Sequence, residues 1–424
     1  MSPTKVRGLA SVLFAVPALL LLLAAAARAD VLVVDAAGGP GVDATQISAA
    51  VALAADGDVI LVRSGSYASF SIVNRSLVVT QDAGAAVIVD GQITVRDLAP
   101  GRQVLLRGLT TGTPSGHGVS VERCAGPVWI EACTLRGAVG VGSFGLGGHG
   151  VAVQDCAAVT LLRCTSTGGD GGPGPAGIDG TGGSGAYSSN SMLAAHGCTF
   201  TGGDGDTGGS GSGGGGSGLW LSSAGFGFAG GCTLTGGDGG VALGTSGCPN
   251  PGAGGYGLFA LFDAHALTLE GTHVGGAGGT ASGLPTCPDG NPGQPVLTAF
   301  PSTHTALAGR ARSLRIPSPV REGQAVQVIL SGDPGDVAWV LASPLQAFLP
   351  LPQHHGVLSV PATTTLLFVG AVPGGGQIVL TTALPELPVG FEAAVLYVAS
   401  AFTGTAEGIV LGSPASLVAL DAGL

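Results

Sequence analysis

The sequence contains almost no lysine. Lys5 is the single lysine in 424 residues, and the formal net charge is −11. A chain with so few cationic side chains lacks the electrostatic footprint that proteins need on nucleic acid. It also has no lysine for Schiff-base chemistry or for a phosphate-binding loop once the first residues are set aside. These absences exclude nucleic-acid binding and lysine-dependent catalysis from the expected functions.

Charged residues are scarce as well, at 10% of the chain, whereas glycine is abundant, with 79 residues. Because glycine destabilises helix interiors, we expect few helices. The apolar content of 45% argues against a disordered chain. The length is sufficient for two domains. The composition therefore predicts a folded protein built mainly from strands and turns.

The N-terminus has the three-part pattern of a secretory signal peptide. A basic patch precedes an apolar run at 9–27, and the small residues Ala27 and Ala29 on either side of Arg28 form a cleavage site. We expect cleavage after Ala29, which leaves Asp30 as the first residue. A retained membrane anchor is the alternative, because the run approaches spanning length. Pro17 and the cleavage site favour removal of residues 1–29, with no transmembrane segment left in the chain, and thus a secreted or cell-surface protein.

The middle of the chain repeats itself. Three near-copies of one stretch, "CTSTGGDGG", "CTFTGGDGD" and "CTLTGGDGG", begin at Cys164, Cys198 and Cys232. Each belongs to a longer repeat with two apolar-alternating segments, a short polar turn and a glycine-rich loop. Repeats of roughly 24 to 40 residues with short strands are typical of solenoid coils, which bury their inner faces by stacking. The longer repeats begin at Gly118, Gly150, Gly185, Gly218 and Gly257.

One helix is expected, at residues 43–57. Asp43 or Thr45 can cap its start, apolar residues fall on one face, and Gly57 ends it. An amphipathic helix at this place would cover the first coil, where an open sheet edge would otherwise invite aggregation.

Two features carry a resemblance to a known fold. They are the opening "AVALAADGDVILVRSGSY" at 50–67 and the repeated C-T-x-x-G turn. Over about residues 44–295 the chain resembles the right-handed parallel β-helix proteins of the pectate-lyase-like superfamily. The resemblance implies an all-β fold, a right-handed parallel β-helix over 30–299 capped by the N-terminal amphipathic helix. It implies little about activity, since one fold hosts many functions.

The residue pattern of the sequence changes from about residue 310, where the glycine-rich repeats have ended. About eight strand-like runs follow one another closely, separated by proline and glycine turns. This pattern predicts a small antiparallel β-sandwich at 310–424, joined by a linker at 300–309. The segment looks like the accessory β-sandwich modules at the C-termini of secreted bacterial proteins, and none of its residues suggests chemistry.

The cysteines fall into two groups. Six occupy repeat positions, and the main position is taken by Leu109 in an early copy and by Thr272 in the last coil. A place shared by Cys, Leu and Thr is an inward packing place, and paired zinc-ligand spacing is absent. Cys248 and Cys287 lie instead in long loops that the coil register brings together. Because we expect a secreted protein, we predict that Cys248 and Cys287 form a disulfide. The six repeat cysteines are Cys124, Cys133, Cys156, Cys164, Cys198 and Cys232.

The tripeptide GHG occurs twice, at 116–118 and 148–150. Polygalacturonases of the same fold carry a catalytic GHG, but they also need an NTD, an adjacent Asp pair and an RIK. The chain has neither of the first two, and only RIP at 315–317. Pectate lyases need clustered carboxylates beside an arginine base, yet no arginine lies between Arg163 and Arg310. We interpret both histidines as turn residues and predict no catalytic residue.

The GGDGG stretches place three aspartates, Asp170, Asp204 and Asp238, at equivalent repeat positions. Acidic residues without a nearby cation repel one another unless solvent or a metal screens them. Carboxylates and loop carbonyls are the ligands that calcium prefers in proteins. The tandem register of calcium-binding roll repeats is absent, however. We favour solvated turns that need no cofactor, and calcium bound by these three aspartates is the alternative.

Three functions are consistent with the sequence. The leading hypothesis is a secreted or cell-surface, non-catalytic β-helix protein, a scaffold or a carbohydrate-contacting protein whose partners are extracellular polysaccharides or cell-surface components. A polysaccharide lyase or glycoside hydrolase is the second, and it rests on fold analogy alone. The third is a self-associating adhesin or matrix protein that uses its glycine-rich loops.

Overall fold

The computed structural model describes residues 29–112, 116–141, 144–173, 180–208, 212–243, 248, 250–282, 287–364, 366–405 and 408–424. The expected signal peptide therefore lies outside the described residues, apart from Ala29. The chain forms two compact units. One comprises Leu32–Asp56 and Ile60–Leu307, and the other is built around Ala308–Leu424. Within the described residues, no helix has the length and apolar character needed to cross a membrane.

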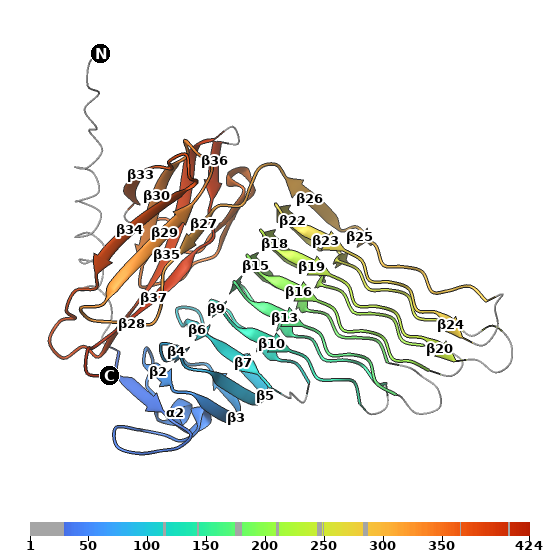
Figure 1. Ribbon diagram of the computed structural model, residues 1–424, viewed down its shortest axis with the longest axis horizontal. Helices are drawn as coiled ribbons and strands as arrows, with labels where there is room; N and C mark the ends of the chain where they lie inside the picture. Colours follow the sequence, from blue (N-terminus) through green and yellow to red (C-terminus); the bar gives the residue numbers. More distant parts are fainter. Residues whose placement is uncertain are drawn as a thin grey trace, which may run out of the picture. The chain divides into compact units, whose positions relative to one another are not determined.

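The first unit is a parallel β-helix, in which successive coils add one strand to each of three ladders (Figure 1). In the first ladder, the strand pairings from β4 onward are all parallel. Its last strand lies in the segment that was expected to be a linker. The ladder consists of β1 (Val31–Val34), β2 (Val59–Val62), β4 (Leu77–Gln81), β6 (Val104–Arg107), β9 (Val128–Glu131), β12 (Val159–Leu162), β15 (Met192–His196), β18 (Phe226–Gly230), β22 (His265–Leu269) and β26 (Thr303–Leu307).

The long strand β5 (Val87–Arg96) joins the other two ladders, and β3 (Gly65–Val73) pairs with it. The second ladder holds β7 (Leu109–Thr111), β10 (Thr134–Arg136), β13 (Thr165–Thr167), β16 (Thr199–Thr201), β19 (Thr233–Thr235) and β23 (Thr272–Val274). The third holds β8 (Val119–Glu122), β11 (Val151–Gln154), β14 (Ala186–Ser189), β17 (Leu219–Ser222), β21 (Leu258–Leu261) and β25 (Val296–Ala299).

The core of the β-helix follows from the alternation of side chains along each strand. In the second ladder the middle residue points inward, as Phe200 and Leu234 do, while the flanking threonines face out. The six repeat cysteines are all buried and free, as an inward packing place requires. The alignment of Thr272 with this place was wrong by one residue. The register pairs Thr272 with the exposed Thr233, so Gly271 lies opposite Cys232.

The glycine-rich segments are not turns, which corrects the expectation from the sequence. They form extended legs stacked in two layers, which we call the glycine stack (Figure 1). Within a layer, the N–H of Gly171 donates to the carbonyl of Asp204 in the next coil. Between layers, the N–H of Gly183 donates to Gly169 and that of Gly203 to Gly183. The outgoing legs are 137–141, 168–173, 202–208, 236–241 and 275–280, and the return legs are 144–149, 180–184, 212–217, 250–256 and 287–294.

The Gly-Gly-x pattern suits this stack, because its period of three matches that of an extended polyproline-II-like chain. The two glycines of each triplet turn toward neighbouring legs and the third residue faces outward. A Cβ placed on Gly183 would lie 1.9 Å from the carbonyl oxygen of Gly148. The legs can therefore approach this closely only where no side chain intervenes. At the far end of the stack, β20 (Ala242–Leu243) and β24 (Ala281–Ser282) form a short parallel pair.

The N-terminal helix is shorter than expected. Helix α2 spans Ile47–Leu53, and neither Asp43 nor Thr45 caps it, because its N-cap is Gln46, whose side chain makes no capping hydrogen bond. Instead, the Asp43 carboxylate accepts a hydrogen bond from the backbone of Val33. Residues Ile47, Ala50 and Val51 are buried in the β-helix core, so the helix does cover the first coils with its apolar face.

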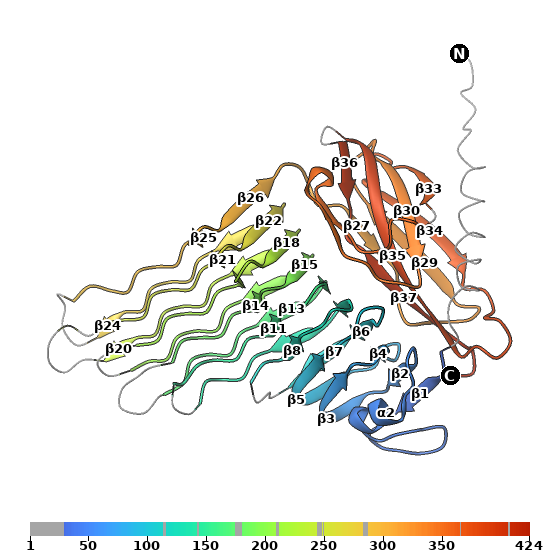
Figure 2. The ribbon, with the colours of Figure 1, turned by 180° about the vertical axis from the view of Figure 1, so that it is seen from behind.

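The second unit is a β-sandwich with one apolar core, and its pairings are antiparallel except between β28 and β37 (Figure 2). One sheet orders β27 (Ser313–Arg315), β29 (Ala325–Ser331) and β34 (Gln377–Ala383). The other contains β28 (Val320–Arg321), β37 (Ala415–Leu420), β35 (Ala393–Thr405), β30 (Val337–Ser343), β33 (Leu366–Ala371) and β36 (Gly408–Leu411). A hairpin of β31 (Leu349–Leu351) and β32 (Gly356–Leu358) flanks the one-turn η2 (Pro352–His354).

Candidate functional site

Five rings from successive coils form a continuous line, three of them on strands of the third ladder and two just before its strands. We call this set, His117, His149, Tyr187, Trp220 and Phe259, the aromatic stripe. The ring centroids lie 5.0, 4.8, 5.1 and 5.6 Å apart in that order. Tyr187, Trp220 and Phe259 share one register position, because β14, β17 and β21 pair residue for residue. All five rings are half-buried, so part of each faces solvent.

The two histidines of the stripe are fixed by backbone hydrogen bonds. The N–H of His149 donates to Nδ1 of His117 at 3.0 Å, and the N–H of Ser184 donates to Nδ1 of His149 at 2.9 Å. One coil earlier, the side-chain oxygen of Gln92 accepts from the N–H of His117 in the same manner. Since Nδ1 is the acceptor in both rings, Nε2 carries the hydrogen of each neutral imidazole.

Burial disfavours the charged form of both rings. It lowers the pKa of His117, against which the carboxylate of Glu122 acts weakly in the other direction. Burial, aided by the neighbouring His117, lowers the pKa of His149 to about 3. Both rings are therefore neutral donors at ordinary pH. The interpretation of the GHG histidines as turn residues is incomplete, because their rings also tie successive coils together through these hydrogen bonds.

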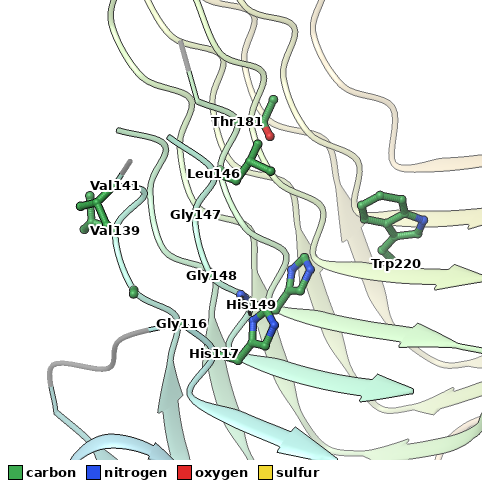
Figure 3. Close-up of a pocket in the computed structure, with 12 residues that line it drawn as sticks. Gly116, His117, Val139, Val141, Leu146, Gly147, Gly148, His149, Thr181 and Trp220 are labelled. Atoms are coloured by element: carbon green, nitrogen blue, oxygen red, sulfur yellow. Dashed lines mark hydrogen bonds between the residues drawn. The ribbon is translucent and has the colours of Figure 1, made fainter. Parts of the chain in front are cut away.

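A pocket of about 850 Å³ opens beside the two histidines, where the glycine stack begins (Figure 3). Val139 and Val141 lie on one side of the imidazoles and Trp220 on the other (Figure 3). Leu146 and Thr181 come from return legs of the stack. Val139, Val141 and Leu146 are 57, 84 and 59% exposed, which is unusual for aliphatic side chains gathered at one place. The described lining residues include no carboxylate, arginine or lysine.

This arrangement can bind but offers little for acid–base chemistry. Glycoside hydrolysis typically needs a pair of carboxyl groups, one on each side of the bond that is cleaved. The described lining of the pocket has none, and its histidines have their Nδ1 atoms occupied by the backbone. The pocket instead combines aromatic faces, aliphatic walls and neutral N–H donors, which are the groups that hold an uncharged ligand.

The three aspartates of the GGDGG stretches lie on outgoing legs, at the outward position of the triplet. They do not simply point to water. The Asp170 carboxylate accepts the N–H of Asp204 at 3.0 Å, Asp204 accepts that of Asp238 at 2.8 Å, and Asp238 accepts that of Ala277 at 2.7 Å. We call this series the aspartate ladder. Among the described residues, no three His, Cys, Asp or Glu side chains gather closely enough to hold a metal ion. Calcium binding here stays an untested alternative.

The predicted disulfide partners are joined in the structure. Cys248 and Cys287 form a bond, with their Cα atoms 5.2 Å apart, across the far end of the glycine stack. The six repeat cysteines are free and buried, and burial raises the pKa of the Cys133 and Cys198 thiols. The buried Cys133 and Cys198 thiols are therefore unreactive packing groups.

The aromatic stripe was missed at the sequence level, although a signal for it exists. In the aligned repeats "GAYS", "GLWL" and "GLFA", the third residue is aromatic in three successive coils. An outward position that repeats an aromatic is unusual on a solvated strand face. The two histidines could not be joined to this series from sequence, because they precede the strands by two register positions.

Comparison with solved structures gives distant matches. Pectate lyase Pel9A is 11% identical, with a TM-score of 0.28, and the match covers 57% of this chain and 78% of that one. Tailspike protein 2 of Escherichia coli O157:H7 bacteriophage CAB120 is 11% identical, with a TM-score of 0.26, over 87% of this chain and 55% of that one. No family model and no curated protein sequence matches the chain. The parallel β-helix is therefore assigned from the strand pairing itself.

Proposed function

We propose that the protein is a secreted or cell-surface β-helix that binds polysaccharide without cleaving it. The aromatic stripe is the observation that carries this proposal. Partly exposed aromatic rings offer a sugar chain apolar area with a defined geometry and little loss of side-chain entropy. His117, His149 and Tyr187 stack on one another, so these three rings contribute their edges. Rings at 4.8 to 5.6 Å spacing form a track along the coils rather than a single subsite.

The alternative of a lyase or hydrolase gains no support from the pocket. The described lining contains no carboxylate pair and no arginine base. Buried histidines with a pKa near 3, as at His149, are unprotonated and already accept a backbone hydrogen bond. The adhesin alternative uses the glycine-rich segments for self-association. Many backbone N–H and C=O groups of those segments are hydrogen-bonded to one another within the stack. Fewer of them are therefore left for a partner.

The test is binding and turnover by the purified full chain. Isothermal titration against a panel of uncharged and acidic oligosaccharides should show saturable binding, and reducing-sugar and unsaturated-uronate assays should show no product. Trp220→Ala should weaken binding by about tenfold or more, equal to ~1.4 kcal/mol, because aromatic anchors dominate binding surfaces.

Phe300→Ala is the matched control. Its ring is 71% exposed and lies outside the stripe, stacked on Phe262. Its affinity should equal that of the unsubstituted chain. Absence of binding across the whole panel, or equal losses in the two variants, would refute the proposed function. Turnover that survives purification would refute the non-catalytic part alone.

A further inference from the structure

The pocket at one end of the aromatic stripe has a chemistry narrower than polysaccharide binding in general requires. Building on the proposed function, we propose that the stripe and pocket bind an uncharged polysaccharide that carries N-acetyl groups, with one acetyl group seated in the pocket. Three features of the described residues lead to this ligand class: the charge around the site, the donors it presents and its aliphatic walls.

The charge around the site disfavours acidic glycans. Uronate and sulfate groups are recognised by arginine and lysine, which neutralise and hydrogen-bond them. The described lining has neither, and the sequence has no arginine between Arg163 and Arg310 and no lysine after Lys5. The net charge of −11 adds long-range repulsion of an anionic chain. An uncharged ligand has none of these costs.

The two histidines can offer hydrogen-bond donors to the pocket. In both histidines Nδ1 already accepts a backbone N–H, so Nε2–H is the group left for a ligand. No described residue is recorded as accepting from either Nε2–H. A neutral donor pairs best with a neutral acceptor, because a charged acceptor would have to lose its hydration in a site without compensating charge. An amide carbonyl oxygen is such an acceptor, and a stronger one than a sugar hydroxyl.

The aliphatic walls of the pocket match the methyl part of an acetyl group. Val139, Val141 and Leu146 are left exposed at the pocket, and a methyl group that packs against them is removed from water, which favours binding. A hexose that bears only hydroxyl groups has no methyl to place there. An N-acetyl group supplies the methyl for the aliphatic walls and the carbonyl for the imidazole, while the sugar rings continue along Tyr187, Trp220 and Phe259.

The experiment compares two hexasaccharides that differ in acetamido groups, chitohexaose and cellohexaose, by titration into the full chain. Chitohexaose should bind about tenfold or more tightly, ~1.4 kcal/mol. Equal affinity, or tighter binding of cellohexaose, would overturn the acetyl assignment while leaving the proposed function intact. If neither binds, the acetyl assignment fails, and the wider panel decides the proposed function separately.

Two variants test the parts of the pocket. Leu146→Asn removes an aliphatic wall and should weaken chitohexaose severalfold while leaving cellohexaose unchanged. His117→Asn keeps an oxygen where Nδ1 accepts the backbone N–H of His149, but it removes the Nε2–H donor. It should weaken chitohexaose at an unchanged melting temperature. The control Val274→Asn replaces an exposed valine, 45% accessible, on the second ladder, and should change neither affinity. Loss of affinity in the control, or unchanged preference in both pocket variants, would overturn the assignment.

Discussion

Each coil of the β-helix has a strand half and a glycine-rich half, and the two halves stack on neighbouring coils in different ways. In the strand half, side chains such as Phe200 and Leu234 fill a continuous core, and the backbone pairs in parallel ladders. In the glycine half, the legs meet without side chains, and backbone bonds run both within and between two layers. The strand half tolerates changes that keep volume and polarity, whereas the glycine half tolerates almost no added atom. Stability is therefore sensitive to lost volume in one half and to gained volume in the other.

The largest effect is expected from lost volume in the strand half. Phe200 is fully buried on β16, between the inward residues of neighbouring coils. Phe200→Ala should lower the free energy of unfolding by about 3–5 kcal/mol, through lost transfer energy and the cavity left behind. Denaturant titration measures this. Phe200→Leu, which keeps most of the volume, should cost clearly less, and an equal cost for both would contradict the packing argument.

The glycine half should respond to added volume. A Cβ on Gly216 would lie 1.9 Å from the carbonyl oxygen of Gly183, a backbone atom that cannot swing away. Gly216→Ala should therefore cost about 1–3 kcal/mol or more. Gly214→Ala is a control on the same leg, since its Cβ meets nothing closer than 3.4 Å. If the two variants melt alike, the stack is looser than the described contacts imply.

The two halves also differ in what their sequences reveal. The strand half could be predicted, because alternation, repeat length and the cysteine column all follow from burying one face of each strand. The glycine half was interpreted as turns, since glycine permits turns and close packing equally and only coordinates show the hydrogen bonds between Gly169, Gly183 and Gly203. The stripe was missed because Tyr187, Trp220 and Phe259 are outward residues, and periodicity identifies inward ones.

Acid should weaken the β-helix, in part through a buried histidine of the strand half. Burial, together with Arg163, lowers the pKa of His196 to about 3, and its ring packs on Phe228 of the next coil. The unfolded chain takes up this proton below a pKa of about 6.5, whereas the folded chain does not until about pH 3. Stability is thus complete above about pH 6.5 and falls as the pH drops below it, by about 1.4 kcal/mol per pH unit for each such histidine.

His196→Gln should flatten the fall in stability between about pH 6 and pH 4.5, measured as the free energy of unfolding at each pH. The comparison is made on slopes, because the substitution also changes the stability at neutral pH. An unchanged slope in His196→Gln would show that this histidine does not cause the acid sensitivity.

The smallest effect is expected in the aspartate ladder, which lies on the exposed side of the glycine stack. Asp204 accepts the N–H of Asp238, and an exposed hydrogen bond of this kind contributes about 0.5 kcal/mol. Asp204→Ala should therefore lower stability slightly. Asp204→Asn keeps an oxygen acceptor and removes one of three like charges in a column, so its melting temperature should stay level or rise slightly.

The effect of calcium on the melting temperature distinguishes the aspartate ladder from a metal site. If the carboxylates only accept backbone hydrogen bonds, adding calcium leaves the melting temperature of the unsubstituted chain where it was. If Asp170, Asp204 and Asp238 bind the ion, calcium raises that temperature by mass action, and replacing all three with Asn abolishes the rise, because Asn keeps a carbonyl oxygen but loses the charge. We expect no response, since one oxygen of each carboxylate is already directed at the next coil's N–H. A rise of several degrees that the triple variant loses would replace the hydrogen-bond ladder with a calcium site as the reason for these aspartates.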